Sequence, residues 1–266
     1  MKLGVLFVVA VFYASSAFAQ VNPTDPMKDS PRHHEWVTIA SDGRSVYSFV
    51  AYPEKAQKAS AVIVIHENLG LTDWVKSFTD QLAGAGYIAI APDLLSSVDS
   101  KHSRTDDFKS SDDARYAISQ LDPDRITRDL LAVQNYISRL PSSNGKTAVI
   151  GFCWGGAQSF RFATHSADIS AALVFYGSPP MAEEEIRRIA APVYGFYGGN
   201  DPRVSATIPV TQDLMKKNGK VYEYEIYDGA GHAFMRLGED PKDTPENRMA
   251  REKSWVRIKE ILSRIQ

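Results

Sequence analysis

The stretch Gly151-Phe152-Cys153-Trp154-Gly155 decides the fold of this chain, and Cys153 is its only cysteine. Glycines two residues before and two residues after a reactive side chain are typical of a sharp strand-to-helix turn that lifts a nucleophile above a sheet. The apolar run before it predicts a buried strand over residues 147–150, and the run after it predicts a helix over residues 156–164. Such a turn leaves no room for a Cβ beside it, which accounts for the glycines. The exposed N–H groups at the start of the helix would favour a thiolate over a thiol.

The alternative interpretation is a buried core cysteine that lies between two glycines by chance. Glycine makes up about 7% of residues in proteins, so a given cysteine has glycine at both positions about once in two hundred. We therefore favour the turn.

Short apolar runs alternate with amphipathic segments on both sides of this turn. The predicted strands cover residues 61–65, 87–91, 147–150, 171–176, 193–196 and 222–226. The predicted helices cover residues 72–83, 123–140, 156–164, 182–189, 208–218 and 244–264. Apolar runs without polar alternation indicate a mostly parallel sheet that is covered on both faces. Two more strands, over residues 36–39 and 46–52, predict an N-terminal antiparallel hairpin. With right-handed crossovers, these elements predict a single-domain, doubly wound α/β fold.

The N-terminus has the features of a cleavable export signal. Lys2 precedes an apolar run over residues 3–12, and Ala17-Phe18-Ala19 is typical of a cleavage site. The run is shorter than the roughly 20 residues that span a bilayer. We expect residues 1–19 to be removed after Ala19, giving a soluble periplasmic or secreted protein without a membrane anchor. A flexible, Pro-rich lead-in over residues 20–34 and one domain over residues 35–266 would remain.

Charge and cysteine usage narrow the classes of partner. The chain has 30 basic and 32 acidic residues and a formal net charge of −2, which gives no sign of a nucleic-acid or membrane partner. A lone cysteine cannot form an internal disulfide, so its thiol in an oxidising compartment is either buried or used. The adjacent His33 and His34 point apart in any regular backbone, and we expect no metal there. We expect a monomer that needs no cofactor.

Two further side chains follow predicted strands at the same sheet edge as Cys153. Asp201 follows the strand over residues 193–196, and His232 follows the strand over residues 222–226. The chain order nucleophile, acid, histidine suits a fold with this turn. His232 would then activate Cys153, and Asp201 would orient His232. An aspartate after a strand is otherwise a turn or cap residue, but the joint arrangement favours a triad.

The loop after the strand over residues 61–65 contains Glu67 and Asn68. A backbone N–H at this position usually forms one arm of an oxyanion hole, and the residue after the nucleophile forms the other. We assign these arms to Asn68 and Trp154. Glu67 is otherwise a cap or surface carboxylate. Tyr176 either lines the pocket or belongs to the core.

Two polar segments remain. Residues 96–111 predict an irregular insertion at the carboxyl edge of the sheet, where active-site loops gather, and we expect it to shape specificity. Arg125, Arg128 and Asp129 predict a solvent-facing side of the helix over residues 123–140.

Together, several motifs resemble those of the dienelactone hydrolase (carboxymethylenebutenolidase) family. They are His66-Glu67-Asn68-Leu69-Gly70, Ala91-Pro92-Asp93-Leu94, Gly151-Phe152-Cys153-Trp154-Gly155-Gly156, Gly199-Asn200-Asp201 and Gly231-His232-Ala233-Phe234. The resemblance runs from about residue 35 to the C-terminus. It implies an α/β-hydrolase fold without a large cap, and a reaction on an ester or lactone carbonyl. It also implies that Glu67 engages the resting thiol and helps to deprotonate it when substrate arrives.

The substrate-binding residues depart from the family pattern. The family holds the substrate carboxylate with two arginines, and Arg236 matches the second of them. The first falls on Ser96-Ser97 and is missing, with Arg104 in the insertion as a candidate replacement. Two arginines orient and bind an anion far better than one.

We therefore expect Cys153 to attack a small ester or lactone as a thiolate, giving a thioacyl-enzyme that water clears without a metal. The alternatives are a thiol hydrolase of another acyl bond, such as a thioester or small amide, and a non-catalytic binding module on a hydrolase scaffold.

Overall fold

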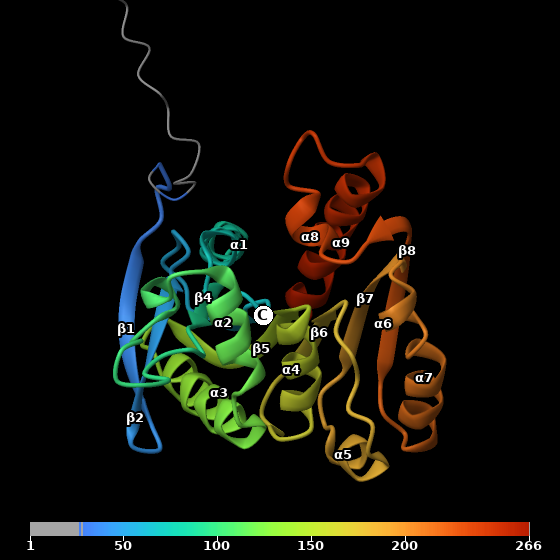
Figure 1. Cartoon of the computed structure of the whole chain (residues 1–266), viewed down its shortest axis with the longest axis horizontal. Helices are drawn as coiled ribbons and strands as arrows, with labels where there is room; N and C mark the ends of the chain where they lie inside the picture. The colour runs from blue at the N-terminus through green and yellow to red at the C-terminus, as the bar shows by residue number, and fades with distance from the viewer. Residues whose placement is uncertain (1–26, 28, 266) are drawn as a thin grey trace, which may run out of the picture.

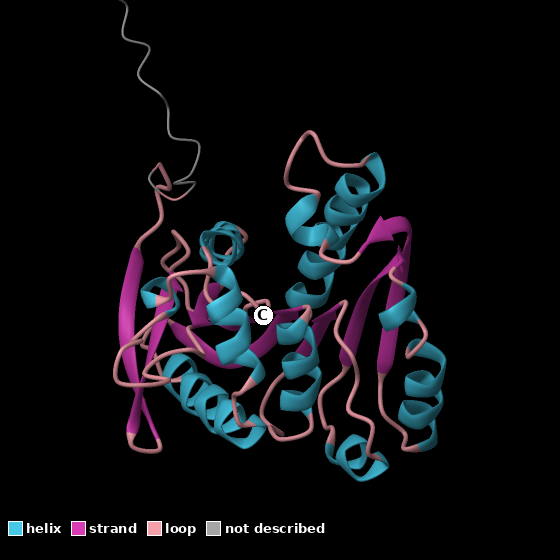
Figure 2. Ribbon diagram, viewed as in Figure 1, coloured by secondary structure: helices cyan, strands magenta, loops and turns pink. Residues whose placement is uncertain are grey.

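The computed structural model describes residue 27 and residues 29–265, so the predicted export signal and most of the lead-in lie outside the described residues. Within them, eight strands form one sheet in the order β1-β2-β4-β3-β5-β6-β7-β8 (Figure 2). Their bounds are β1 (His34–Ser41), β2 (Arg44–Ala51), β3 (Ala59–Ile65), β4 (Ile88–Pro92), β5 (Ser143–Phe152), β6 (Ala171–Phe175), β7 (Val193–Asn200) and β8 (Tyr222–Gly231). The β1–β2 and β2–β4 pairs are antiparallel, whereas the pairs from β4 through to β8 are parallel. The predicted hairpin and mostly parallel α/β sheet are confirmed.

Helices cover both faces of the sheet (Figure 1). Their bounds are α1 (Asp73–Gly84), α2 (Ser111–Ser119), α3 (Pro123–Ser138), α4 (Trp154–Ala163), α5 (Glu183–Arg188), α6 (Pro202–Ser205), α7 (Ile208–Lys217), α8 (Phe234–Leu237) and α9 (Pro245–Ser263). One core contains buried side chains of α1, α8 and α9, and the other contains those of α3, α4, α5 and α7.

The central strand β3 explains why two cores form. Side chains alternate along a strand, so Val62 and Val64 enter one core while Ile63 and Ile65 enter the other. All residues of β3 are buried. Full burial of each such aliphatic side chain stabilises a fold by about 1.5–3 kcal/mol, so a strand apolar on both faces has a strong preference for this central place.

The segment expected to be an irregular insertion is more regular than predicted. It contains a short 3-10 turn, η1 (Thr105–Asp107), and α2 begins at its end, at Ser111. The Ser110 side chain caps α2 by accepting a hydrogen bond from the N–H of Asp113. Only Ala114 and Ile118 of α2 are buried, one turn apart, which is too short a pattern to reveal the helix in the sequence.

The predicted solvent-facing side of α3 is wrong for one of its residues. Asp129 is buried and accepts a hydrogen bond from Arg44 of β2 at 2.7 Å. Arg125 is half-buried and donates to the carbonyl oxygens of Ser96 and Ser97. The charges attach α3 to the hairpin and to the loop after β4.

The described part of the expected lead-in is attached to α1. Asp80 is buried and accepts hydrogen bonds from Ser30, Arg32 and His34. His33 instead contacts Glu35, so the two adjacent histidines do point apart.

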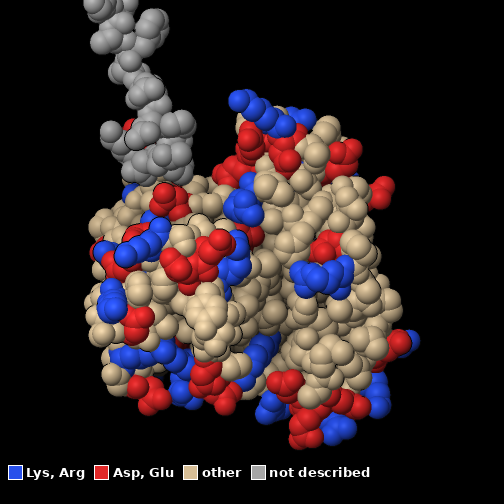
Figure 3. Space-filling model, viewed as in Figure 1, with Lys and Arg blue, Asp and Glu red and all other residues tan. Residues whose placement is uncertain are grey.

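The surface has no single dominant sign of charge on the face in view, because acidic and basic side chains are interspersed over it (Figure 3). No helix in the described part of the chain has both the length and the apolar character needed to cross a membrane.

Candidate active site

Cys153 lies at the turn between β5 and α4 with φ at 55° and ψ at −115°. This φ is unusual for a residue with a side chain and persists only where the surroundings impose it. A Cβ on Gly151 would lie 1.9 Å from the carbonyl oxygen of Gly155, and one on Gly155 would lie 2.3 Å from that of His66. The backbone therefore requires glycine at both positions, as the predicted turn demands.

His232 and Asp201 reach this turn from the two neighbouring strands at the edge of the sheet. His232 follows β8 and Asp201 follows β7, and the His232 Nδ1 lies 2.6 Å from the Asp201 Oδ2. A hydrogen bond with Cys153 raises the pKa of His232; burial opposes that rise, and the Asp201 carboxylate adds to it. Since Nδ1 contacts Asp201, Nε2 is the ring nitrogen left for the thiol. The structure thus places His232 between the Asp201 carboxylate, to which it is hydrogen-bonded, and the Cys153 thiol, which raises its pKa.

Tyr176 lies beside this chain at the end of β6. Its φ is 39°, and its ring centroid is 4.9 Å from that of His232. The side chain is buried, and its hydroxyl has no hydrogen-bond partner among the described residues. Burial, and then the charges of Glu67 and Cys153, raise the pKa of Tyr176 well above its usual value. The phenol is therefore a neutral O–H donor that lies beside His232 and has no acceptor among the described residues.

Glu67 bonds to Arg236 and not to the thiol. The Arg236 Nε donates to the Glu67 Oε2 at 2.7 Å, and the Glu67 side chain is 6% exposed whereas that of Arg236 is 37% exposed. Burial lowers the pKa of Arg236, but the attraction of Glu67 outweighs it and the net shift is upward. The contact between Glu67 and the resting thiol that the family resemblance implies is thus replaced by a charge-assisted bond to the guanidinium.

The two predicted oxyanion-hole amides lie on adjoining segments. Trp154 is the first residue of α4, so its N–H has no acceptor within the helix. Asn68 lies in the loop after β3, and the carbonyls of Ile65 and His66 pack directly against Gly155 of α4. The end of β3 and the start of α4 therefore meet at the same edge of the sheet as the triad.

His66 supports this junction, a role that the sequence analysis did not assign. Its Nε2 accepts a hydrogen bond from the N–H of Leu94, so its Nδ1 is the protonated nitrogen and donates to the Glu67 carbonyl at 2.7 Å. Complete burial lowers the pKa of His66 and keeps the ring neutral. The ring stacks on Trp154 at a centroid distance of 5.4 Å. The signal available in the sequence was a histidine placed directly after a strand.

Asp93 and Thr105 join three segments that are distant in the sequence. The buried Asp93 carboxylate accepts hydrogen bonds from the Thr105 N–H at 2.6 Å and from its hydroxyl at 2.8 Å. The Thr105 hydroxyl in turn accepts a bond from the N–H of Leu71 at 3.0 Å. A Cβ on Gly70 would overlap the Thr105 side chain. The insertion is thereby attached to the loop that carries Glu67 and Asn68.

Arg104, the candidate replacement for the missing first arginine, contacts a residue outside the triad. The guanidinium of Arg104 lies over the ring of Trp36 on β1, 5.2 Å from its centroid. At the family's arginine position, Ser96 is buried and its hydroxyl accepts a hydrogen bond from the N–H of Tyr47 at 2.9 Å. A substrate-binding role for Arg104 stays a prediction, whereas Arg236 lies within the site. Across residues 29–265, no three His, Cys, Asp or Glu side chains gather in a way that could hold a metal ion.

Comparison with known proteins assigns this arrangement to a family. The model of the dienelactone hydrolase family matches residues 46–266. The chain belongs to the dienelactone hydrolase family. It is a hydrolase that acts on ester or lactone bonds.

Relatives of this dienelactone hydrolase cover most of its length. A protein of Saccharolobus solfataricus, provisionally named a carboxymethylenebutenolidase, is 32% identical in an alignment of 258 residues that covers 85% of this chain and 96% of the relative. A Bradyrhizobium sp. protein, provisionally named a 2-oxo-3-(5-oxofuran-2-ylidene)propanoate lactonase, is 26% identical over 212 residues, 75% of this chain and 83% of the relative.

The fold recurs in solved structures. The crystal structure of a dienelactone hydrolase-like promiscuous phosphotriesterase from metagenomic libraries superimposes with a TM-score of 0.73. It covers 88% of this chain and 98% of its own, with 23% sequence identity, so the likeness establishes the α/β-hydrolase fold alone.

Proposed function

We propose that this protein hydrolyses a small ester or lactone by covalent catalysis, with Cys153 as the nucleophile. The observation that carries the proposal is the position of His232, which is hydrogen-bonded to Asp201 and lies next to the Cys153 thiol that raises its pKa. The unusual backbone of Cys153 at the start of α4 presents its sulfur to a bound carbonyl.

The reaction proceeds in two halves. The Cys153 sulfur attacks the carbonyl carbon, and the thiol proton passes to His232 Nε2. The C–O bond then breaks, the leaving oxygen takes the proton from His232, and a thioacyl-enzyme forms. In a lactone this step opens the ring, and the alcohol stays attached to the acyl group. His232 next removes a proton from water, which attacks the thioester carbonyl. The C–S bond then breaks, the sulfur takes the proton back from His232, and the carboxylic acid and the free thiol are released.

When the sulfur attacks, negative charge develops on the carbonyl oxygen of the substrate, and hydrogen-bond donors at the sheet edge must stabilise it. The amides of Asn68 and Trp154 take this role in our proposal, since they lie on the two segments that meet beside Cys153. Loss of one such donor costs about 2.7–4 kcal/mol of transition-state stabilisation. The Tyr176 hydroxyl, which has no acceptor among the described residues, is placed to bond the substrate.

The preferred substrate carries no carboxylate. Glu67 already balances the charge of Arg236, and Ser96 occupies the place of the family's other arginine. The lactone named for the Bradyrhizobium relative is a carboxylic acid, and we propose that this chain differs from it in preferring a neutral ring.

The protein acts outside the cytoplasm in this proposal. The support comes from the sequence, in the basic start, the short apolar run and the small residues before Gln20. Fractionation of cells that express the full chain should recover protein beginning at Gln20 outside the cytoplasm. Retention of the uncleaved chain in the cytoplasm would contradict export and leave the catalytic proposal untouched.

The catalytic proposal is tested by turnover of a matched panel. Mature protein and its Cys153→Ala variant are assayed with a p-nitrophenyl short-chain ester, a neutral lactone, a carboxylated dienelactone, a thioester and a small amide. We expect turnover of the ester and the neutral lactone, and its loss in the variant. Equal turnover by the variant would contradict the nucleophile. Preference for the thioester or amide would contradict the substrate class.

A further inference from the structure

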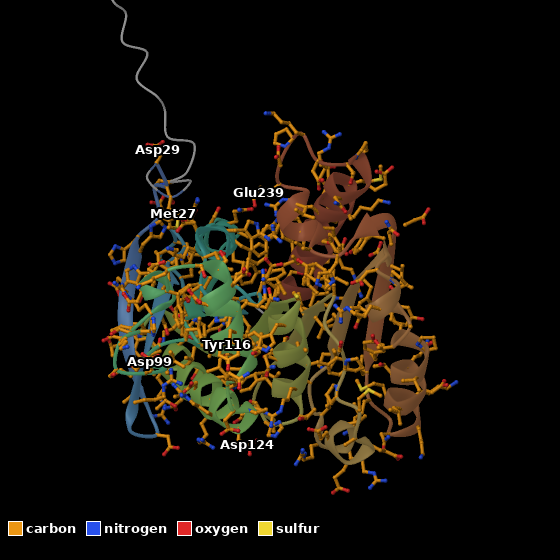
Figure 4. The ribbon with its side chains drawn as sticks, in the orientation of Figure 1. Met27, Asp29, Asp99, Tyr116, Asp124 and Glu239 are labelled. Carbon is orange, nitrogen blue, oxygen red and sulfur yellow. The ribbon has the colours of Figure 1, made fainter. Side chains whose placement is uncertain are left out.

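A cavity lies between the loop after β4, α2 and the start of α3. Its volume is about 710 Å³. No triad residue lines it, nor does any residue assigned above to the oxyanion hole. Two of its lining residues, Asp99 and Tyr116, are labelled in Figure 4.

One part of the cavity wall is apolar. Phe108 and Leu121 pack on the small hydrophobic cluster under α2, while the Tyr116 side chain is 69% exposed. The His102 ring covers one face of Phe108 at a centroid distance of 4.1 Å. Val98 and Ala117 complete this part. Such a wall suits a flat or branched hydrocarbon body.

The acidic side chains in the wall are already hydrogen-bonded to donors of the protein. Asp99 accepts bonds from the N–H groups of Lys101 and His102 and contacts the His102 ring. Asp113 accepts from the Ser110 hydroxyl, and Asp122 caps α3. Their negative charges are therefore partly compensated inside the wall.

The basic side chains in the wall are not compensated in this way. Within residues 29–265, Lys101, Lys109 and Arg125 have no carboxylate at ion-pair distance. Arg125 reaches only the carbonyls of Ser96 and Ser97, at 3.3 and 3.4 Å, and its buried Nε has no partner among the described residues. Arg125 also lines a neighbouring cavity of about 260 Å³, where Arg44 and Arg128 are paired with Asp129 and Asp42. The cavity thus has an apolar wall beside three cations that have no ion-pair partner among the described residues, whereas each of its three carboxylates already accepts hydrogen bonds from the protein.

We propose that this cavity is a binding site for a small organic anion with a ring-containing apolar body, separate from the hydrolytic site. The hydrocarbon part lies against Phe108, Tyr116 and Leu121. The acid group lies near Lys101, Lys109 and Arg125, because an anion gains most where cations lack partners. This site goes beyond the hydrolytic reaction and does not depend on the nucleophile assigned above.

Binding in this cavity would also restrict the motion of α2. Phe108, Ala117 and Leu121 belong to the cluster that also contacts the Trp154 ring. A bound ligand therefore orders the loop and α2 together, and amide hydrogen exchange should slow over residues 98–125.

The test uses 2-naphthoate and its neutral carboxamide as probes of the mature protein by titration calorimetry. Binding of naphthoate should exceed that of the amide by about tenfold, a modest charge effect at a partly exposed site, and should weaken in high salt. The variant Lys101→Gln/Lys109→Gln should bind naphthoate about tenfold more weakly while its ester hydrolysis is unchanged. Lys216→Gln/Lys242→Gln removes two exposed charges elsewhere and should bind like the wild type.

Three results would overturn the proposal: no binding of naphthoate, equal binding of naphthoate and its amide, or equal affinity of the Lys101/Lys109 variant and the wild type. A final arm separates this site from the catalytic one. Protein alkylated at Cys153 with iodoacetamide should bind naphthoate unchanged, with exchange protection over residues 98–125. Loss of binding on alkylation would place the probe at the triad and refute a separate site.

Discussion

The pKa of His232 depends on both of its neighbours in the candidate triad, Cys153 and Asp201. Its hydrogen bond with Cys153 is the largest cause of the raised pKa, ahead of the opposing effect of burial and the support of Asp201. We predict that Cys153→Ala lowers the pKa of His232 relative to the wild type. Titration of the ring protons by NMR would measure it. Asp201 remains in the variant and still opposes the lowering effect of burial.

The same shift predicts how His232 affects stability. A pKa raised by folding stabilises the protein fully below the unfolded value of about 6.5, and this stabilisation disappears as pH rises through the folded value. The stability difference between the wild type and His232→Gln should therefore shrink as pH rises through that range. Urea unfolding at several pH values would reveal it, and a difference that grows with pH would contradict the assignment.

At Tyr176, one substitution should affect activity and stability in different ways. Tyr176→Phe removes a buried hydroxyl that has no partner among the described residues, so the free energy of unfolding should stay the same or rise. If the hydroxyl bonds the substrate, kcat for ester hydrolysis should fall about tenfold or more, since one lost donor can cost a hundredfold. Steady-state kinetics and urea unfolding of the same variant decide this. Unchanged kinetics would mean that Tyr176 is a core residue whose hydroxyl does not bind the substrate.

At this residue scale the sequence predicted that Cys153, Asp201 and His232 meet at one sheet edge, but not the contacts that support them. Cys153, Asp201 and His232 each follow a strand, so their meeting at one edge is a consequence of parallel pairing. The bond between Glu67 and Arg236 joins residues 169 positions apart and depends on where α8 places its side chain. Spacing in the sequence does not contain that information.

Among the elements, the insertion after β4 has the clearest link to the site. The Thr105 hydroxyl donates a hydrogen bond to the Asp93 carboxylate and accepts one from the N–H of Leu71. Thr105→Val removes both bonds. Since the loop with Asn68 then loses its support, kcat should fall about tenfold to a hundredfold, with a smaller change in KM.

Thr72 offers a matched control for this element, because its side chain makes no capping bond to α1. Thr72→Val should leave kcat near the wild-type value. Equal losses in both variants would mean that any methyl-for-hydroxyl change in this region lowers activity, and Thr105 would have no special positioning role.

Helices and strands could be predicted from the sequence where successive residues are buried, but not where only a few of their residues are buried. The continuous apolar run over residues 61–65 made β3 evident from its sequence. The helix α2 buries only Ala114 and Ile118 and was missed, and the polar ends of β5 were missed because strand pairing extends beyond the apolar run. Asp129 was assigned to solvent because its partner Arg44 lies on a distant strand.

Across the whole molecule, Asp80 connects the described N-terminal residues to the sheet through α1. Burial raises the pKa of Asp80, but hydrogen bonds from Arg32, His34 and Ser30 outweigh it and lower the pKa to about 2. A lowered pKa stabilises the fold above the unfolded value of about 3.9, and the stabilisation is lost as pH falls through the folded value.

We predict that Asp80→Asn costs about 2 kcal/mol of unfolding free energy near neutral pH, as loss of hydrogen bonds to a charged group does. The difference from the wild type should shrink as pH falls from about 4 towards about 2, because protonation then neutralises Asp80 in the wild type as well. Asp213→Asn, on the exposed side of α7, is the control and should change little. A difference independent of pH would contradict the ion-pair account.

The central claim is that the sulfur of Cys153 becomes acylated during turnover. The most direct test is mass spectrometry of the intact mature protein and its peptides, quenched in acid during turnover of a p-nitrophenyl ester. The account predicts a mass increase equal to the acyl group on the peptide that contains Cys153, absent from Cys153→Ala. It also predicts accumulation of the adduct in His232→Gln, if that variant still acylates, because water activation is lost. Turnover without acylated Cys153, or acylation at another residue, would contradict it.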